Sequence, residues 1–282
     1  MLFPLPELTD ADREVLAGID EMRRELRYQV QDRPTKWTSG LRKFLTADAV
    51  AASNSIEGFR VSTADVQDLM DGEQDVDVST ENRQETLAYL VSIHPWADGN
   101  GRMSRSLQTL MIAREGVLAP EFSSIEAWLG RPGNTWEYYR ELERRGPVSH
   151  PDQDVSRWIR FNLTAYHQQA QTVRGRMSRS AAVWTSLMSF ADSAGLDERV
   201  VSALHDVALV GRIRRNRYEQ AEGLTRQQSQ RDLRDLTAAG LLETVGRTRA
   251  RYYTAGPRFP EGVLEVARTP MTLSQPYADA LG

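Results

Sequence analysis

The chain has 282 residues, of which 40% are hydrophobic and 26% charged, a composition typical of a globular protein rather than a disordered one. Its net charge of −4 argues against a protein that binds nucleic acid with its whole surface, and the absence of cysteine excludes a disulfide framework and a cysteine-based metal site. Because no stretch is long and apolar enough to cross a membrane and the N-terminus lacks the features of a signal peptide, we expect a cytoplasmic protein with no membrane partner.

Helical periodicity dominates the first two thirds of the chain, where apolar residues recur at gaps of three and four. The predicted helices cover residues 9–30, 46–57, 62–70, 79–93, 101–116, 152–176 and 177–195. The side chains expected to face the core include Val15, Ile19, Met22, Leu26, Val30, Met103, Leu107, Leu110, Met111, Trp128, Trp136, Tyr138, Tyr139, Leu142, Val155, Ile159, Leu163, Tyr166 and Leu187.

The last third of the chain has shorter elements. Two helices are predicted over residues 196–207 and 213–221. Thr225 precedes Gln228 by three residues, the spacing of a capping box, so a third helix is expected to start there and to end at Gly240.

Two short alternating stretches, 242–245 and 250–254, predict a pair of strands after these helices. Residues 211–251 hold ten arginines and five acidic residues, a local charge of +5, so the remainder carries −9. Helices followed by a basic two-stranded wing are typical of a winged helix-turn-helix. Residues 257–282 are expected to form an extended tail.

Residues 94–105, with the sequence HPWADGNGRMSR, combine groups suited to binding phosphate. The turn at residues 99–101 leaves backbone N–H groups available at the start of a helix, which is an anion-binding arrangement. Arg102 and Arg105 lie three residues apart on that helix, and each guanidinium can hold phosphate oxygens through two hydrogen bonds.

The same segment contains a base and a metal ligand. His94 precedes the turn, and an imidazole titrates near neutral pH, so it can deprotonate a hydroxyl that attacks a bound phosphate. Asp98 supplies a hard oxygen ligand suited to magnesium held by one carboxylate and by phosphates. Each residue alone has an ordinary structural explanation, as a core histidine, a common turn or a solvated arginine. Together and in this order, the residues supply all the groups that one phosphate-transfer mechanism needs.

This segment resembles the motif of the Fic family. The matching positions are His94, Pro95, Asp98, Gly99, Asn100, Gly101, Arg102 and Arg105. The resemblance implies that His94 is the general base and Asp98 the magnesium ligand. It also implies that residues 99–101 form the anion-binding turn and that Arg102 and Arg105 contact phosphate. The implied reaction uses Mg²⁺ and ATP, transfers AMP to a Ser, Thr or Tyr hydroxyl of a target protein, and releases pyrophosphate.

A second segment, Ser53 to Gly58 with the sequence SNSIEG, resembles the inhibitory helix that some Fic proteins carry before the active motif. The resemblance implies that Glu57 pairs with Arg105 and obstructs the γ-phosphate of ATP. A carboxylate in the guanidinium fork competes directly with phosphate for the same donors. The alternative is an ordinary helix end with a solvated glutamate.

The resemblance covers about residues 40–175 and becomes looser around residues 136–142 and 157–161. It departs from the family between Glu57 and His94, which are 37 positions apart (94 − 57). Relatives with an N-terminal inhibitory helix place a β-hairpin flap in this interval, which docks the target by strand addition. Either the flap is deleted, or a segment of the natural chain is missing from this sequence.

The predicted helix after Thr225 carries polar side chains suited to DNA, since arginine and glutamine contact phosphates and base edges. These side chains are Arg226, Gln227, Gln230, Arg231 and Arg234, and the wing would add Arg247, Arg249 and Arg251. The alternative is an arm for dimerisation or target docking with solvated arginines.

We therefore expect a mainly α protein, with a Fic-type helical bundle followed by a small winged helix-turn-helix. The expected parts are a Fic domain at 1–176 with its inhibitory helix at about 45–58, a connecting helix at 177–195, the winged helix at 196–256 and the tail at 257–282. The expected function is auto-inhibited AMP transfer to proteins, or a variant that also removes AMP or transfers another phosphate-containing group. The competing hypothesis is a DNA-binding transcription regulator that senses nucleotide through the Fic domain. Candidate partners are ATP, a target protein, DNA and a second copy of the chain.

Overall fold

The computed structural model describes residues 7–27, 36–72, 101, 105–106, 108–110, 120–145, 154–247 and 251–277. This part of the chain is mainly helical, as the sequence predicts. Its elements are α1 (Asp10–Arg27), α2 (Lys36–Ile56), α3 (Thr63–Met70), α6 (Pro120–Ser123), α7 (Glu126–Leu129), α8 (Pro132–Arg145), α9 (Ser156–Ser193), α10 (Val200–Val210), α11 (Arg215–Glu222), α12 (Arg226–Ala238), β1 (Leu242–Val245), β2 (Tyr252–Ala255) and α13 (Glu261–Arg268).

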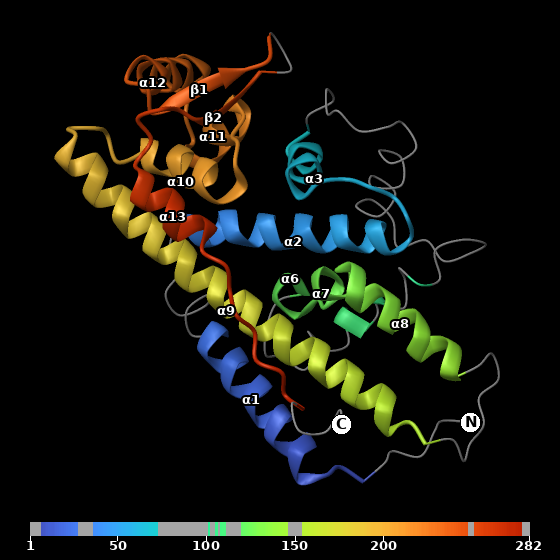
Figure 1. The fold of residues 1–282 in the computed structure, drawn as a ribbon. Helices are drawn as coiled ribbons and strands as arrows, with labels where there is room; N and C mark the ends of the chain where they lie inside the picture. Colours follow the sequence, from blue (N-terminus) through green and yellow to red (C-terminus); the bar gives the residue numbers. More distant parts are fainter. Residues whose placement is uncertain are drawn as a thin grey trace.

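Helix α9 runs diagonally through the molecule (Figure 1), and the elements that it contacts include α1, α2, α6, α7, α10 and α13. It has 38 residues, which corresponds to about 57 Å at 1.5 Å per residue. The prediction of a helix ending near Arg176 and a separate connecting helix at 177–195 is therefore wrong. Gly175 weakens a helix by only about 1 kcal/mol relative to alanine, and the buried face continues beyond it at Met177 and Val183.

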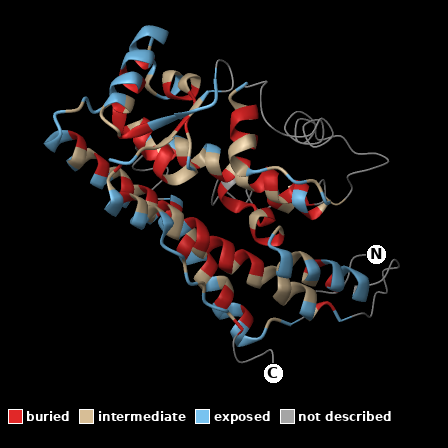
Figure 2. Cartoon of the chain, turned by 45° about the horizontal axis from the view of Figure 1, so that its top comes forward, coloured by how far each residue is buried: buried red, intermediate tan, exposed pale blue. Residues whose placement is uncertain are grey.

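Three buried apolar clusters lie along α9, and each includes residues of that helix. Ala165 and Tyr166 pack with α1, α7 and α8, whereas Val173 and Met177 pack with α1, α2 and α6. Near its end α9 packs on the C-terminal helices. Figure 2 shows the buried residues concentrated along α9 and the elements that cross it. One continuous helix thus joins the N-terminal and C-terminal parts of the protein.

Helix α2 begins ten residues earlier than the predicted start at Thr46. Its first turns contain Gly40, which lowers helix propensity, but they bury Leu41 and Leu45 against the middle of α9, and this packing outweighs propensity. Helix α3 follows the prediction, and Ser62 caps it by accepting a hydrogen bond from the Asp65 amide.

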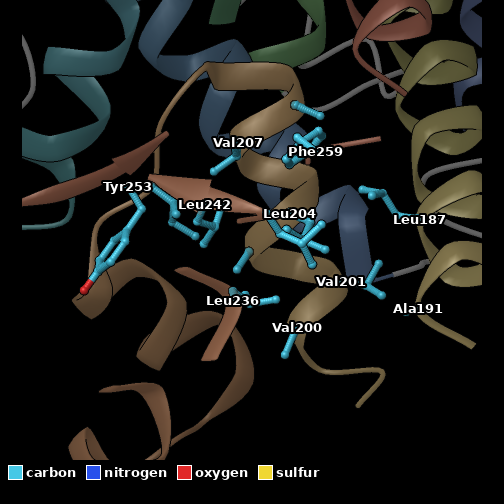
Figure 3. Packing of buried hydrophobic residues seen from close by; sticks show 14 of the residues in the cluster. Leu187, Ala191, Val200, Val201, Leu204, Val207, Leu236, Leu242, Tyr253 and Phe259 are labelled. Atoms are coloured by element: carbon cyan, nitrogen blue, oxygen red, sulfur yellow. The ribbon is translucent and has the colours of Figure 1, made fainter. Parts of the chain in front are cut away.

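The C-terminal elements form a separate core. The capping box of Thr225 and Gln228 opens α12, as predicted, and Leu233 and Leu236 of α12 are buried. Figure 3 shows how Leu236 and Leu242 meet α10, while α9 contributes Leu187 and Ala191 from the other side. Strand β1 pairs with β2 antiparallel, with Leu242 opposite Ala255. The second strand covers Tyr252–Ala255, slightly later in the chain than the predicted 250–254.

The predicted extended tail at 257–282 is partly wrong, since residues Glu261–Arg268 form α13, which packs on α9 and α10. Val263 and Phe259 enter the C-terminal core, which explains why this segment becomes helical. Residues 269–277 are irregular and run back along α9 (Figure 1), so that Tyr277 reaches the N-terminal core.

Helix α1 is held at its N-terminus by a buried carboxylate. Its predicted core residues from Val15 to Leu26 are buried, while Val30 lies outside the described residues. Asp12 accepts hydrogen bonds from the Thr9 hydroxyl at 2.7 Å, from Arg160 at 3.1 Å and from the Tyr277 hydroxyl at 2.9 Å. Burial alone would raise the pKa of Asp12, but these hydrogen bonds hold that pKa well below its usual range.

We predict that Asp12→Asn lowers the free energy of unfolding by about 2 kcal/mol, because several hydrogen bonds to a charged acceptor are weakened. A depressed folded-state pKa contributes stability above the unfolded-state pKa of about 4, and this contribution disappears as the pH falls below that value. Urea unfolding at several pH values measures the effect. Asp10→Asn is the control, since Asp10 is exposed and should change stability little. A difference between Asp12→Asn and wild type that did not shrink in acid would contradict the assignment.

Candidate functional site: a buried arginine and the end of α2

The C-terminus of α2 is fixed in a defined turn that places Glu57. The carbonyl oxygen of Asn54 accepts hydrogen bonds from the amides of Glu57 at 3.1 Å and Phe59 at 3.0 Å. Gly58 between them has φ +92°, a left-handed conformation that favours glycine. From α8, the Tyr139 hydroxyl donates to the carbonyl oxygen of Ile56 at 3.1 Å. The glutamate backbone is therefore held from both sides.

The ion pair between Glu57 and Arg105 that the sequence predicts is present. Arg105 Nη2 lies 2.8 Å from Glu57 Oε1 and also donates to the Ser53 hydroxyl at 3.3 Å. Ser53 and Glu57 are four residues apart, so both face the guanidinium from the same side of α2. The inhibitory role of Glu57 remains a prediction.

Gly101 lies directly against this pair. A Cβ atom at position 101 would come within 3.0 Å of Glu57 Oε1 and 3.1 Å of Arg105 Nη1, closer than side chains normally approach. The absence of a side chain at Gly101 therefore allows the carboxylate and the guanidinium to lie beside the backbone. Three of the predicted site residues are brought together in this way.

The structure shows a second carboxylate near Arg105, which the sequence analysis did not predict. Glu126 of α7 is 4% exposed, and its Oε1 atom lies 3.8 Å from Arg105 Nε. The Ser124 hydroxyl donates to the other oxygen of Glu126 at 3.2 Å, and the Tyr138 ring centre lies 6.0 Å from the guanidinium carbon. No motif marks Glu126, since only the packing of α7 against α2 places it near Arg105.

The two partners of this ion pair differ in exposure. The Arg105 side chain is 3% exposed, whereas the Glu57 side chain is 28% exposed. Burial alone would lower the pKa of Arg105, but the hydrogen bond to Glu57 and the nearby charge of Glu126 contribute to raising it overall. Arg105 is thus a fixed cation, and Glu57 is the partner that solvent can reach.

The other predicted site residues lie outside the described residues. These are His94, Asp98, Gly99, Asn100 and Arg102. The same holds for the core positions Met103, Leu107 and Met111.

Several predicted core side chains are exposed. Trp136 is 73% exposed, Leu110 and Tyr139 are each 45% exposed, and Leu142 is 38% exposed. Helix α8 is amphipathic and buries Tyr138, as predicted, but its buried face is narrower than expected and does not include Trp136, Tyr139 or Leu142.

The C-terminal surface has the predicted polar composition. Helix α12 exposes Arg226, Gln227, Gln230, Arg231 and Arg234, and Arg247 and Arg251 are exposed beside the two strands, while Arg249 lies outside the described residues. Helix α12 has two acidic residues. Asp232 lies on its inner side and pairs with Arg199 at 2.8 Å, whereas exposed Asp235 lies 3.8 Å from Arg231 and 3.5 Å from Arg234.

No family model matches the chain, and no curated protein matches it. The resemblance to the Fic family therefore remains a prediction from residues 53–58 and 94–105. None of the helices that the structure describes has the length and apolar character of a membrane-spanning helix.

We predict that Arg105→Met costs about 3 kcal/mol of unfolding free energy, because it removes a positive charge from beside the buried carboxylate of Glu126. Glu57→Gln should cost less than about 1 kcal/mol, since Glu57 is partly solvated and Arg105 keeps Glu126 nearby. Urea denaturation compares the two variants with wild type. Equal losses would show that Glu57 is a structural partner of Arg105 rather than a releasable one.

Proposed function

We propose that this protein is an auto-inhibited enzyme of the Fic type, which transfers AMP from ATP to a hydroxyl of a target protein. The 2.8 Å contact between Glu57 and Arg105 is the observation that carries the proposal. It joins two motifs that lie 48 residues apart in the chain, and it is the contact that the resemblance implies for the inhibited state. A chance helix end would not be expected to aim a glutamate at this arginine.

The residues of the active motif have distinct roles in this proposal. His94 takes the proton from the target hydroxyl, whose oxygen then forms a bond to the α-phosphorus of ATP. The bond between the α-phosphorus and its bridging oxygen breaks, and pyrophosphate leaves. Arg102 and Arg105 hold phosphate oxygens, and residues 99–101 offer backbone N–H groups to them. Glu57 blocks this by occupying the guanidinium of Arg105.

In this proposal ATP would bring a magnesium ion to the site. Asp98 provides the carboxylate oxygen that magnesium prefers, and the phosphates of ATP provide further oxygen ligands. When bound, the ion would offset the negative charge of the phosphates. The C-terminal elements and α9 would then form the winged helix and the connection to the Fic-type bundle.

Removal of AMP is a close variant of this function, in which Glu57 orients a water instead of obstructing ATP. Transfer of a different phosphate-containing group is another variant, because the motif offers contacts to the phosphates of a nucleotide rather than to its base. The mass gained by a modified target distinguishes an adenylate from other groups.

We predict that Glu57→Gly raises AMP transfer from α-labelled ATP by about tenfold or more, because about 1.4 kcal/mol of competition for Arg105 is removed. His94→Ala should abolish transfer in both backgrounds, since the base is lost. The measurement is label on protein after incubation with Mg²⁺, with and without cell lysate. Ser55→Gly, which places glycine on the same helical turn without touching Arg105, should behave like wild type.

Labelling that survives His94→Ala would contradict the assigned base. No label in any variant, with ATP still bound, would favour the nucleotide-sensing regulator over the enzyme.

We propose DNA binding as a second function, carried by the exposed arginines and glutamines of α12 beside the two strands. The helix is anchored by its buried apolar face, so its polar face is available to a groove of DNA. Residues 211–251 carry a charge of +5, although the whole chain carries −4. A locally basic surface of this kind attracts the phosphates of DNA.

We predict that duplex DNA binds with an affinity that falls steeply with salt, and that Arg231→Ala reduces the slope of log K against log [salt] by about 1. Fluorescence anisotropy at several salt concentrations measures this. Arg268→Ala, which changes an exposed residue at the end of α13, is the control and should leave the slope unchanged. Absence of binding at low salt would instead favour an arm for dimerisation or target docking.

A further inference from the structure

Helix α3 presents a row of acidic side chains to the C-terminal part of the protein. Asp65, Asp68 and Asp71 recur every three residues at α3 and its C-cap, which places them along one side of the helix. Opposite them lies the segment 212–217, which leads from α10 into α11 and carries Arg212, Arg214, Arg215 and Arg217.

The contacts across this boundary are short. Arg212 Nη2 lies 2.7 Å from Asp65 Oδ1 and 2.7 Å from Asp68 Oδ2. Arg214 Nε donates to Asp68 Oδ2 at 3.0 Å. Burial dominates the pKa of Asp68 and raises it, although Arg212 and Arg214 oppose that shift.

A third contact extends the row. Arg217 Nη1 lies 3.3 Å from Asp71 Oδ2, and Lys43 of α2 lies 2.8 Å from the other oxygen of Asp71. The side chains of Asp71 and Arg217 are 2% and 7% exposed. Ion pairs this buried are screened little by solvent, and removing one partner of such a pair has a larger effect than at an exposed site.

The arginine segment is fixed to the C-terminal core. Ile213 exchanges backbone hydrogen bonds with Tyr253 of β2, both at 2.9 Å. Tyr218 of α11 is fully buried and donates to Asp232 of α12 at 3.0 Å. The surface that receives α3 is thus continuous with the helix that carries the exposed arginines.

The acidic helix is also close to the candidate site along the chain. Only residues 57–62 connect the end of α2 to α3, and Glu57 is the first of them. The Tyr139 hydroxyl holds Ile56, the residue before this segment, and after the segment α3 is held by α2 and by its ion pairs with Arg212. Helix α3 also packs on α2 through the buried side chains of Val66 and Val50. Removing the ion pairs would therefore leave α3 held by α2 alone, without its contact to the C-terminal part.

We propose that the docking of α3 on the arginine segment 212–217 keeps Glu57 on Arg105, so that the C-terminal part of the protein controls auto-inhibition. This inference rests on the proposed function. A partner that shifts the segment 212–217, such as DNA on α12, would release Glu57 through α3. The inhibited state is then a property of both halves of the chain rather than of α2 alone.

The test removes the central cation of the boundary and leaves the candidate site intact. Arg212→Gln eliminates the contacts to Asp65 and Asp68, and Arg215→Gln is the matched control, since Arg215 pairs with Glu219 inside α11 at 2.8 Å. We expect Arg212→Gln to raise AMP transfer about fivefold, at the lower end of typical coupling between sites, and Arg215→Gln to have no effect. Combined with Glu57→Gly, Arg212→Gln should add nothing, because both changes act on one contact.

Hydrogen exchange provides a readout that does not need activity. The amides of residues 57–62 should exchange faster in Arg212→Gln than in Arg215→Gln, while those of α9 stay protected. Asp65→Asn removes the partner of Arg212 on α3 and should also speed exchange at residues 57–62. Agreement between the two variants excludes a folding defect that is specific to one of them. A melting curve for each variant verifies that it is folded.

The possible failures are distinguishable. If Glu57→Gly is inactive, the proposed function fails, and the exchange at residues 57–62 still decides whether α3 controls this segment. If Glu57→Gly is active but Arg212→Gln behaves like Arg215→Gln in both readouts, the control by α3 is wrong and the function stands. A rise caused by Arg212→Gln on top of Glu57→Gly would also overturn the inference, since the effect would bypass Glu57.

Discussion

Helix α9 is the constraint on which the rest of the structure depends. Its buried positions enter three separate apolar clusters, so α1, α2, α7, α8, α10 and α13 all take their places from one rigid element. A continuous helix of 38 residues cannot be bent at little cost unless it contains proline or another defect, and no proline interrupts α9. The candidate site and the C-terminal surface are therefore parts of one framework, although they lie far apart in the sequence.

The candidate site depends on an asymmetry in burial between two partners of opposite charge. Arg105 is almost completely buried and has carboxylates on two sides, while Glu57 is reached by solvent and stands at the end of a helix. The proposed function uses this asymmetry, since it requires the guanidinium of Arg105 to keep its position while phosphate takes the place of Glu57. Close packing of Gly130 against Ala52, where a Cβ atom would come within 2.8 Å, brings α7 and its Glu126 near enough to α2 to complete this arrangement.

The charges at the boundary between α3 and the C-terminal core follow a different principle. Surface ion pairs contribute little to stability, but a row of three carboxylates against arginines in a largely buried boundary specifies one docking position. Apolar packing joins the two halves of the chain along α9, while α3 packs on α2 and its carboxylates pair with the segment 212–217. The two kinds of contact together place the short segment that carries Glu57, and this placement is the physical basis for relating the C-terminal surface to the candidate site.

The sequence by itself determined the elements whose signals are local. The periodicity of Val15 to Leu26, the capping residues Ser62 and Thr225, and the burial of Leu233 and Leu236 all follow from short-range patterns. It also predicted the contact between Glu57 and Arg105, though only through a resemblance between motifs, since charge and spacing alone do not select one arginine among many. Only the tertiary structure decided the early start of α2, the continuity of α9 past Gly175, the helix α13 and the place of Glu126. Each of these depends on packing between segments distant in the sequence, and such packing overrides weak local preferences because burying apolar side chains contributes more free energy than helix propensity does.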